Sequence, residues 1–247
     1  MQTASLNITL HEKQKLIHAN PARFKAIKAG KRFGKSKWAQ FEIVQKAGEK
    51  RGRYWYVAPT YGQAEDIAWR DLVINQDDGE AIIPKQFIKQ TWATKLMIEL
   101  TNGSIITLKG ADNPNTLRGP GLDGVIFDER SYMEESIWPA IIRGQLAKSK
   151  GFAYFISSPW DRGRNHYTTF CEEAKRLMDA GNPDWFYGHY TIWDNPTLDR
   201  KEIQDMKDNM SDDKWSLEYM AEESALGGIR FSEFNRAKNI LDMDYAA

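Results

Sequence analysis

Short apolar runs alternate with amphipathic stretches along the chain, and this alternation predicts the secondary structure. Alternating or continuous apolar positions predict strands over residues 23–29, 53–59, 124–129, 152–159 and 185–191. Three- and four-residue spacing predicts helices over residues 10–20, 36–50, 63–73 and 198–223, with a further helical stretch that ends at residue 146. Residues 96–110 predict two strands around an Asn102-Gly103 turn, because Asn-Gly favours a two-residue hairpin turn.

The order of these elements predicts the fold class. Strands and helices alternate at spacings that suit crossover connections, which indicates an α/β fold with a mostly parallel central sheet flanked by helices. The length of 247 residues suits one large domain or a domain with a small appendage. The tail from Gly227 fits neither a clean helix nor a closing strand. We therefore expect a domain over residues 1–226 and a linker over residues 227–247.

Composition and charge limit the possible partners. Hydrophobic residues make up 41% of the chain, which is enough to bury a core, and the 34 basic residues equal the 34 acidic ones. A polyanionic partner must therefore be held by a local basic patch, since the overall field gives no help. The run at residues 46–53, KAGEKRGR, is a candidate patch, although such runs more often form a solvated face.

The sequence shows no pattern typical of a disulfide framework, a zinc site or a membrane-spanning segment. The single cysteine, Cys171, excludes an internal disulfide and fits a reducing cytoplasm. The four histidines show no zinc-ligand spacing with one another or with that cysteine. The first residues lack the apolar core of a signal peptide, and no apolar run approaches membrane-spanning length.

The turn from Ala29 to Ser36 reads A-G-K-R-F-G-K-S, the phosphate-loop pattern G-x-x-x-x-G-K-[ST] with alanine in the first glycine position. Small residues let backbone N–H groups face phosphate oxygens, and the following helix points its positive end at the same anion. Lys35 would bridge the β- and γ-phosphates of ATP and Ser36 would hold Mg²⁺. The alternative is a basic strand-to-helix turn without a ligand. The expected nucleotide-binding residues are Ala29, Gly30, Lys31, Arg32, Phe33, Gly34, Lys35 and Ser36.

A second motif, V-I-F-D-E, supplies the acids that a phosphate loop needs. Asp128 follows three apolar residues and would complete the Mg²⁺ site at a strand tip. Glu129, immediately after it, would polarise a water for attack on the γ-phosphate. A strand that simply ends in solvated acids is the alternative. Because both motifs occur in the expected order and strand context, the sequence predicts an ATPase.

Four stretches together resemble the ATPase part of the large terminase subunit, the DNA-packaging motor of tailed bacteriophages. They are G-K-R-F-G-K-S, L-R-G-P-G-L-D-G-V-I-F-D-E, I-S-S-P-W-D-R-G and G-G-I-R-F-S-E-F-N. The resemblance implies a P-loop NTPase fold of the RecA/ASCE-like type with a small helical lid, near the N-terminus and over residues 195–225. It also implies ATP-driven movement of double-stranded DNA into a procapsid in the host cytoplasm, with no membrane association. The implied partners are the portal protein, the small terminase subunit and other copies of the chain in a ring, the chain alone being monomeric.

The resemblance also assigns roles to single residues. Arg118 matches an arginine proposed to reach the γ-phosphate of a neighbouring subunit, although local pairing with Asp112 or Asp123 is the alternative. Arg32 is a second candidate for that role, so the catalytic set is Glu129 with Arg118 or Arg32.

Three further positions match weaker parts of the family pattern. Gln14 resembles a glutamine that reads the adenine edge, against a plain helix-surface glutamine. Ser157 and Ser158 match a motif that couples nucleotide state to the rest of the domain, unless they only cap the following turn.

Other activities are less well supported by the sequence. Asp242 and Asp244 are too few for the two-metal nuclease site of terminases, so no nuclease activity is expected. A superfamily-2-like helicase should add a second RecA-like domain, for which 247 residues leave no room. A nucleotide-dependent DNA-binding scaffold with little turnover would not need Glu129.

Overall fold

The computed structural model describes residues 6–74, 80–160 and 163–223, so the expected linker over residues 227–247 lies outside the described residues. In these ranges eight strands form one sheet in the order β3-β4-β5-β2-β6-β7-β1-β8. The strands are β1 (Phe24–Ala29), β2 (Arg53–Ala58), β3 (Ile88–Trp92), β4 (Met97–Leu100), β5 (Ile105–Gly110), β6 (Gly124–Asp128), β7 (Phe152–Ser157) and β8 (Trp185–Tyr190).

The strand directions confirm the expected mostly parallel α/β sheet. Strands β5, β2, β6, β7, β1 and β8 pair in parallel, whereas β4 and β3 continue the sheet antiparallel beyond β5. The predicted hairpin is also confirmed, since β4 and β5 pair around the Asn102-Gly103 turn with φ of 83° at Gly103. A positive φ of this kind is what glycine accepts without strain.

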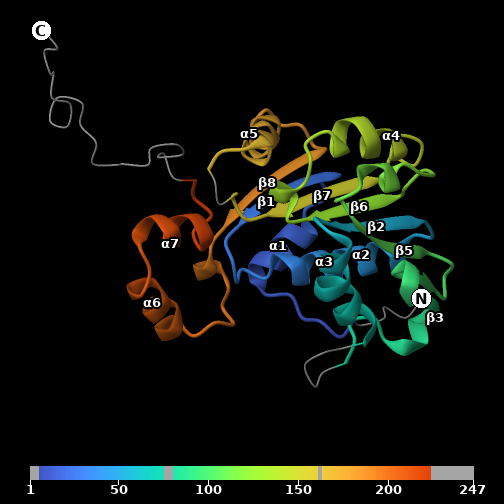
Figure 1. The fold of residues 1–247 in the computed structure, drawn as a ribbon, viewed down its shortest axis with the longest axis horizontal. Helices are drawn as coiled ribbons and strands as arrows, with labels where there is room; N and C mark the ends of the chain where they lie inside the picture. Colours follow the sequence, from blue (N-terminus) through green and yellow to red (C-terminus); the bar gives the residue numbers. More distant parts are fainter. Residues whose placement is uncertain (1–5, 75–79, 161–162, 224–247) are drawn as a thin grey trace, which may run out of the picture.

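Helices cover both faces of the sheet (Figure 1). Helices α1, α2 and α3 lie on one face, and α4 and α5 on the other. The helices are α1 (Glu12–Ala19), α2 (Lys35–Glu49), α3 (Tyr61–Ala64), α4 (Arg143–Gln145), α5 (His166–Asp179), α6 (Arg200–Asp208) and α7 (Asp212–Glu218). Helix α3 continues as a π-helix over Glu65–Ile74, and another π-helix, Ile137–Ile142, precedes α4.

Two apolar clusters pack against opposite faces of the sheet. One holds Trp38 and Ile43 of α2 with Ile126 of β6, and the other holds Phe127 of β6 with Trp138. Neighbouring residues of β6 thus enter different clusters, because successive side chains of a strand point to opposite faces. A third, small cluster of Ile192, Ile203 and Trp215 lies under α6 and α7, which form a separate lobe at the left of Figure 1.

Candidate active site

The loop between β1 and α2 has the backbone of an anion-binding turn. Arg32 has φ of 65° and Gly34 has φ of 95°, both in the left-handed region. Alternation of right- and left-handed residues turns successive N–H groups toward one point, and α2 begins immediately afterwards at Lys35. The loop is therefore shaped to receive a phosphate group.

Side chains from two other segments hold this loop from outside. The carbonyls of residues 32, 33 and 34 accept hydrogen bonds from Asn195 Nδ2 (2.7 Å), His11 Nε2 (3.1 Å) and Gln14 Nε2 (2.9 Å). Since Gln14 Oε1 also accepts from the His11 backbone N–H at 3.0 Å, both ends of the Gln14 amide are engaged. In this structure, Gln14 is thus buried behind the phosphate loop and fixes its shape.

Asp128 ends β6 and is fully buried. Tyr56 OH donates a hydrogen bond to Oδ2, while Oδ1 has no hydrogen-bond partner within the described ranges. Burial, together with the adjacent Glu129 carboxylate, raises the pKa of Asp128 to about 6, and this net value already includes the opposing effects of Tyr56, Lys35 and Ser36. A buried acid with one open oxygen is suited to accept a cation.

Glu129 lies between the phosphate loop and the end of β7. Its Oε1 is 3.0 Å from Lys35 Nζ, and its Oε2 accepts from Ser157 Oγ (3.0 Å) and the Ser158 backbone N–H (3.3 Å). Lys35 Nζ also donates to Ser158 Oγ at 3.0 Å. We call these four residues the Lys35–Glu129 network. It forms because the order β6-β7-β1 brings the carboxyl ends of these strands to one edge.

Two expected residues lie outside this network. Arg118 follows the 3-10 turn Pro114–Leu117, and both Arg118 and Arg32 are exposed. Neither guanidinium makes a hydrogen bond or ion pair with another residue of the described ranges. Asp123, one suggested partner of Arg118, instead pairs with Lys50 at 3.0 Å. The exposed Arg118 side chain is therefore unpaired within the part of the chain that the structure describes.

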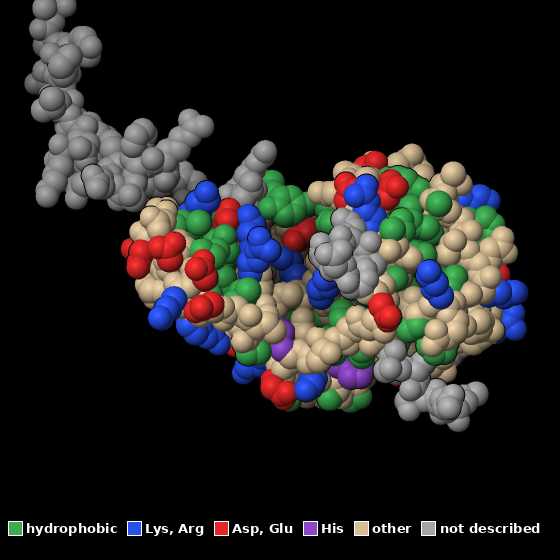
Figure 2. Space-filling view, turned by 90° about the horizontal axis from the view of Figure 1, so that it is seen from below, with side chains coloured by type: hydrophobic (Ala, Val, Ile, Leu, Met, Phe, Trp, Pro, Cys, Tyr) green, Lys and Arg blue, Asp and Glu red, His purple; other side chains and the backbone are tan. Residues whose placement is uncertain are grey.

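The lobe of α6 and α7 touches the phosphate loop directly. Lys31 donates its backbone N–H to the Glu218 carbonyl (2.7 Å), and its Nζ lies 3.0 Å from Glu218 Oε2. Figure 2 shows a hollow between this lobe and the body of the molecule, with Lys and Arg side chains gathered around it. The candidate site thus lies where the two parts of the chain meet.

Sequence reasoning missed several residues that build the site. Tyr56 reaches Asp128 from the next strand, and Ser131 bonds Ser157 both through its N–H (3.2 Å) and through its hydroxyl (2.7 Å). Asn195 reaches the loop from a distant part of the chain. No local motif marks these positions, since each role arises only when the fold brings the partners together.

Neither a cluster of metal-ligating side chains nor a membrane-spanning helix occurs among the described residues. In residues 6–74, 80–160 and 163–223, no group of three or more His, Cys, Asp and Glu side chains is arranged to hold a metal ion. Among the described helices, none has the length and apolar character needed to cross a bilayer.

Comparison with known proteins places the chain in a family. The family model for the N-terminal part of the T4-like-virus type of terminase large subunit matches residues 26–238. The terminase large subunit of Escherichia phage T5 is 29% identical over 225 residues, covering 90% of this chain and 48% of that protein. That of Thermus virus P23-45 is 27% identical over 235 residues, covering 86% of this chain and 48% of that protein. The chain thus spans about half the length of these curated relatives.

Solved structures agree with this placement. The large terminase ATPase domain of Thermus phage P74-26 superposes with a TM-score of 0.71 at 26% identity, over 88% of this chain and 95% of that one. The large terminase of bacteriophage HK97, at 13% identity and a TM-score of 0.63 over 87% of this chain and 51% of that one, shares the fold. The chain therefore belongs to the terminase large subunit family, and its described residues have the fold of that family's ATPase domain.

Proposed function

We propose that this chain hydrolyses ATP to drive double-stranded DNA into a viral procapsid, as the ATPase part of a terminase large subunit. The observation that carries the proposal is the meeting of Lys35 and Glu129 at 3.0 Å, beside the buried Asp128 and at the mouth of the phosphate loop. A phosphate-binding cation, a water-orienting carboxylate and a metal-binding acid are the parts that phosphoryl transfer to water requires.

The residues present fit Mg²⁺. Among the described residues, the buried Oδ1 of Asp128 has no hydrogen-bond partner, and the Ser36 hydroxyl is near enough to this acid to lower its pKa. Ser36 and Asp128 would hold the ion, and Mg²⁺ would offset the negative charge of the phosphate oxygens. Since most ligands of such an ion are phosphate oxygens and waters, the site needs no cluster of protein acids.

Lys35 and Glu129 neutralise each other in this structure. Triphosphate oxygens carry more negative charge than one carboxylate, so we expect Lys35 Nζ to turn from Glu129 to the phosphates when ATP binds. Glu129, still held by Ser157 and Ser158 through Oε2, is then free to accept a proton from the attacking water through Oε1. Lys35 Nζ also donates to Ser158 Oγ in this structure, so its turn toward the phosphates would break that bond at the end of β7. This change is the coupling role that we propose for Ser158 and the adjacent Ser157.

We further propose that Arg118 acts in a neighbouring subunit. Its guanidinium is exposed and has no partner among the residues described, so it can complete a site across a subunit boundary. An arginine that a neighbouring subunit supplies in this way, called an arginine finger, accelerates hydrolysis by roughly 10³–10⁵-fold. The proposal includes a ring of copies on the procapsid with the portal protein and the small terminase subunit as partners. Arg32 remains the second candidate for the finger.

The lobe of α6 and α7 falls within the segment 195–225 expected to form a lid, and it is the proposed lid. Its own apolar cluster and its contacts with residues 31 and 32 support movement as a unit that follows the state of the phosphate loop. At the N-terminal end, in contrast, Leu10 and Ile17 join the main core. We therefore propose the C-terminal segment, rather than the N-terminal end, as the lid.

The test is a separation of binding from hydrolysis. Glu129→Gln keeps the hydrogen bonds from Ser157 and Ser158 but removes the base, so ATP and Mg²⁺ binding should persist while turnover falls at least about 10²-fold. Lys35→Ala should instead weaken ATP binding itself. Binding is measured with a fluorescent ATP analogue and turnover by phosphate release. Near-wild-type turnover in Glu129→Gln would overturn the assignment.

A further inference from the structure

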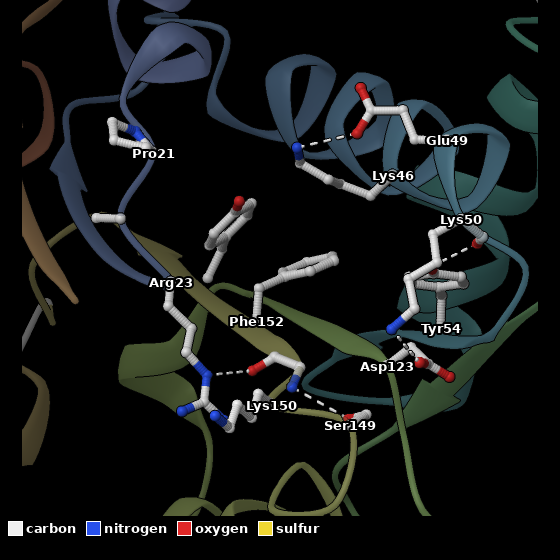
Figure 3. Close-up of a pocket in the computed structure, with 13 residues that line it drawn as sticks. Pro21, Arg23, Lys46, Glu49, Lys50, Tyr54, Asp123, Ser149, Lys150 and Phe152 are labelled. Carbon is white, nitrogen blue, oxygen red and sulfur yellow. Dashed lines mark hydrogen bonds and ion pairs between the residues drawn. The ribbon is translucent and has the colours of Figure 1, made fainter. Parts of the chain in front are cut away.

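A second concave site lies at the edge of the sheet opposite to the phosphate loop. It has a volume of about 320 Å³ and is lined by residues that precede or begin β1, β2, β6 and β7, together with the end of α2. Because these strands are parallel, their amino ends share one edge and their carboxyl ends the other. We call this site the amino-edge cleft (Figure 3).

The cleft concentrates positive charge in a chain whose net charge is zero. Four lining side chains are basic and two are acidic; the basic ones are Arg23, Lys46, Lys50 and Lys150. They come from three separate segments of the chain, and the run over residues 46–53 contributes two of them. Arg51, Arg53 and Lys148 are also exposed and are close in sequence to lining residues. The fold therefore builds a local basic patch.

Part of this charge has no counter-ion within the described residues. Arg23 donates Nε to the Gly151 carbonyl at 2.7 Å and has no carboxylate within ion-pair distance. Lys150 is exposed and makes no hydrogen bond or ion pair with the rest of the described chain. Lys50 pairs with Asp123 at 3.0 Å, but its side chain is 63% exposed, so water screens that pair. These three groups can therefore neutralise an external anion.

The placement of the charges favours a polymer backbone over a small ligand. In Figure 3, Phe152 lies in the middle of the cleft, with Lys46 and Lys50 on one side and Arg23 and Lys150 on the other. The aromatic lining residues Tyr54 and Tyr154 are buried, whereas the side chains of Lys50 and Lys150 are exposed. Phosphodiester recognition needs cations at the surface and no buried donors, because release of counter-ions supplies the affinity. A small phosphate ligand would need donors in the interior of the site.

We propose that the amino-edge cleft is a contact surface for the phosphate backbone of duplex DNA. The proposal rests on the proposed function, which makes double-stranded DNA the substrate. Helix α2 links this surface to the phosphate loop, since it begins at Lys35 and its last turns carry Lys46 and Glu49. Its 15 residues span about 22 Å, so one rigid element joins the ATP site to the DNA surface.

The test measures binding of a short fluorescent DNA duplex by anisotropy between about 0.05 and 0.2 M salt. Lys50→Gln combined with Lys150→Gln should weaken duplex binding at least about tenfold at 0.1 M salt. The slope of the logarithm of the binding constant against the logarithm of the salt concentration should become shallower by about 2, since each neutralised phosphate contributes about 0.9 to it. The matched control is Lys201→Gln combined with Lys207→Gln, two exposed lysines of α6, which should leave both quantities unchanged.

ATP turnover without DNA separates this inference from the proposed function. Neither Lys50 nor Lys150 contacts the Lys35–Glu129 network, so basal turnover should match wild type. Unchanged duplex affinity and salt slope in the double variant would overturn the cleft assignment and leave the ATPase proposal standing. Absence of any duplex binding by the wild-type chain would overturn it as well. Polyglutamate binding that exceeds duplex binding and is lost in the variant would reassign the cleft to an acidic protein.

Discussion

Gly30→Ala tests the contact between the phosphate loop and the lid. A Cβ at residue 30 would lie 2.0 Å from the carbonyl oxygen and 2.5 Å from the carbonyl carbon of Tyr219, both backbone atoms that cannot rotate away. Gly30 does not have a positive φ, so alanine adds no backbone strain of its own. The whole effect must therefore come from separation of the loop and the end of α7.

The magnitude follows from the contacts at that junction. A Cβ and an oxygen need a little over 3 Å, so the two segments must separate by roughly 1 Å. That shift weakens the bonds from Lys31 N to Glu218 O (2.7 Å) and from Ile192 N to Tyr219 O (2.9 Å). Two such bonds and the overpacking together cost about 2–4 kcal/mol. Alternatively, the lid undocks from the phosphate loop. In that case the loss of stability cannot exceed the free energy with which the lid docks.

Thermal unfolding and hydrogen exchange measure both responses. If the lid stays docked, Tm should fall by roughly 5–15 °C, and if it undocks, amides 31 and 192 should lose protection while the sheet keeps it. Gly48→Ala is the control, since a Cβ there meets nothing within 4 Å and alanine favours the helix by about 0.5–1 kcal/mol. Unchanged Tm, exchange and ATP turnover in Gly30→Ala would refute the docked lid.

Two other predictions concern assembly and pH. Arg118→Ala should remove the rise of specific ATPase activity with protein concentration, while nucleotide binding stays nearly unchanged. Mixing the Arg118→Ala and Glu129→Gln chains should restore part of the activity. If mixed assemblies form but show no restored activity, Arg32 becomes the candidate for the trans-acting arginine. Lys25 is buried with Nζ 2.7 Å from the Ile17 carbonyl, and burial lowers its pKa to about 8. Because the unfolded chain holds that proton up to about pH 10.5, wild-type stability should rise relative to Lys25→Met by up to about 3 kcal/mol between pH 8 and 10.5. Denaturant unfolding at several pH values checks this, and a constant difference would contradict it.

The strands that build the site could be predicted because each is a compact apolar run. β6 and β7 are buried along nearly their whole length, so their residues are apolar up to the point where the chemistry begins. The phosphate loop could be predicted for a similar reason, since its function depends on local backbone geometry. Both features are properties of short segments.

Two elements were absent from the expectations, for different physical reasons. β3 (Ile88–Trp92) is an edge strand with mostly exposed side chains, so it has no apolar alternation. α5 (His166–Asp179) buries only Tyr167, Thr168, Cys171 and Ala174, a set with few large apolar residues. Its clearest local signal is Asn165, whose side chain accepts from two backbone N–H groups at the start of the helix.

The remaining site residues depend on tertiary packing. Tyr56 is an ordinary strand tyrosine in the sequence, and only the pairing of β2 with β6 brings it to Asp128. Asn195 likewise becomes a loop-holding residue only when the lobe of α6 and α7 lies against residue 32. Such roles cannot be predicted from spacing along the chain.

The most direct test of the ATPase proposal is Mg²⁺-dependent ATP turnover per chain, measured at rising protein concentration with and without duplex DNA, for wild type and Lys35→Ala. We expect slow turnover in dilute wild type, a rise with protein concentration and with DNA, and no turnover above background in Lys35→Ala. Wild-type turnover no greater than that of Lys35→Ala at every concentration, with DNA present, would contradict it.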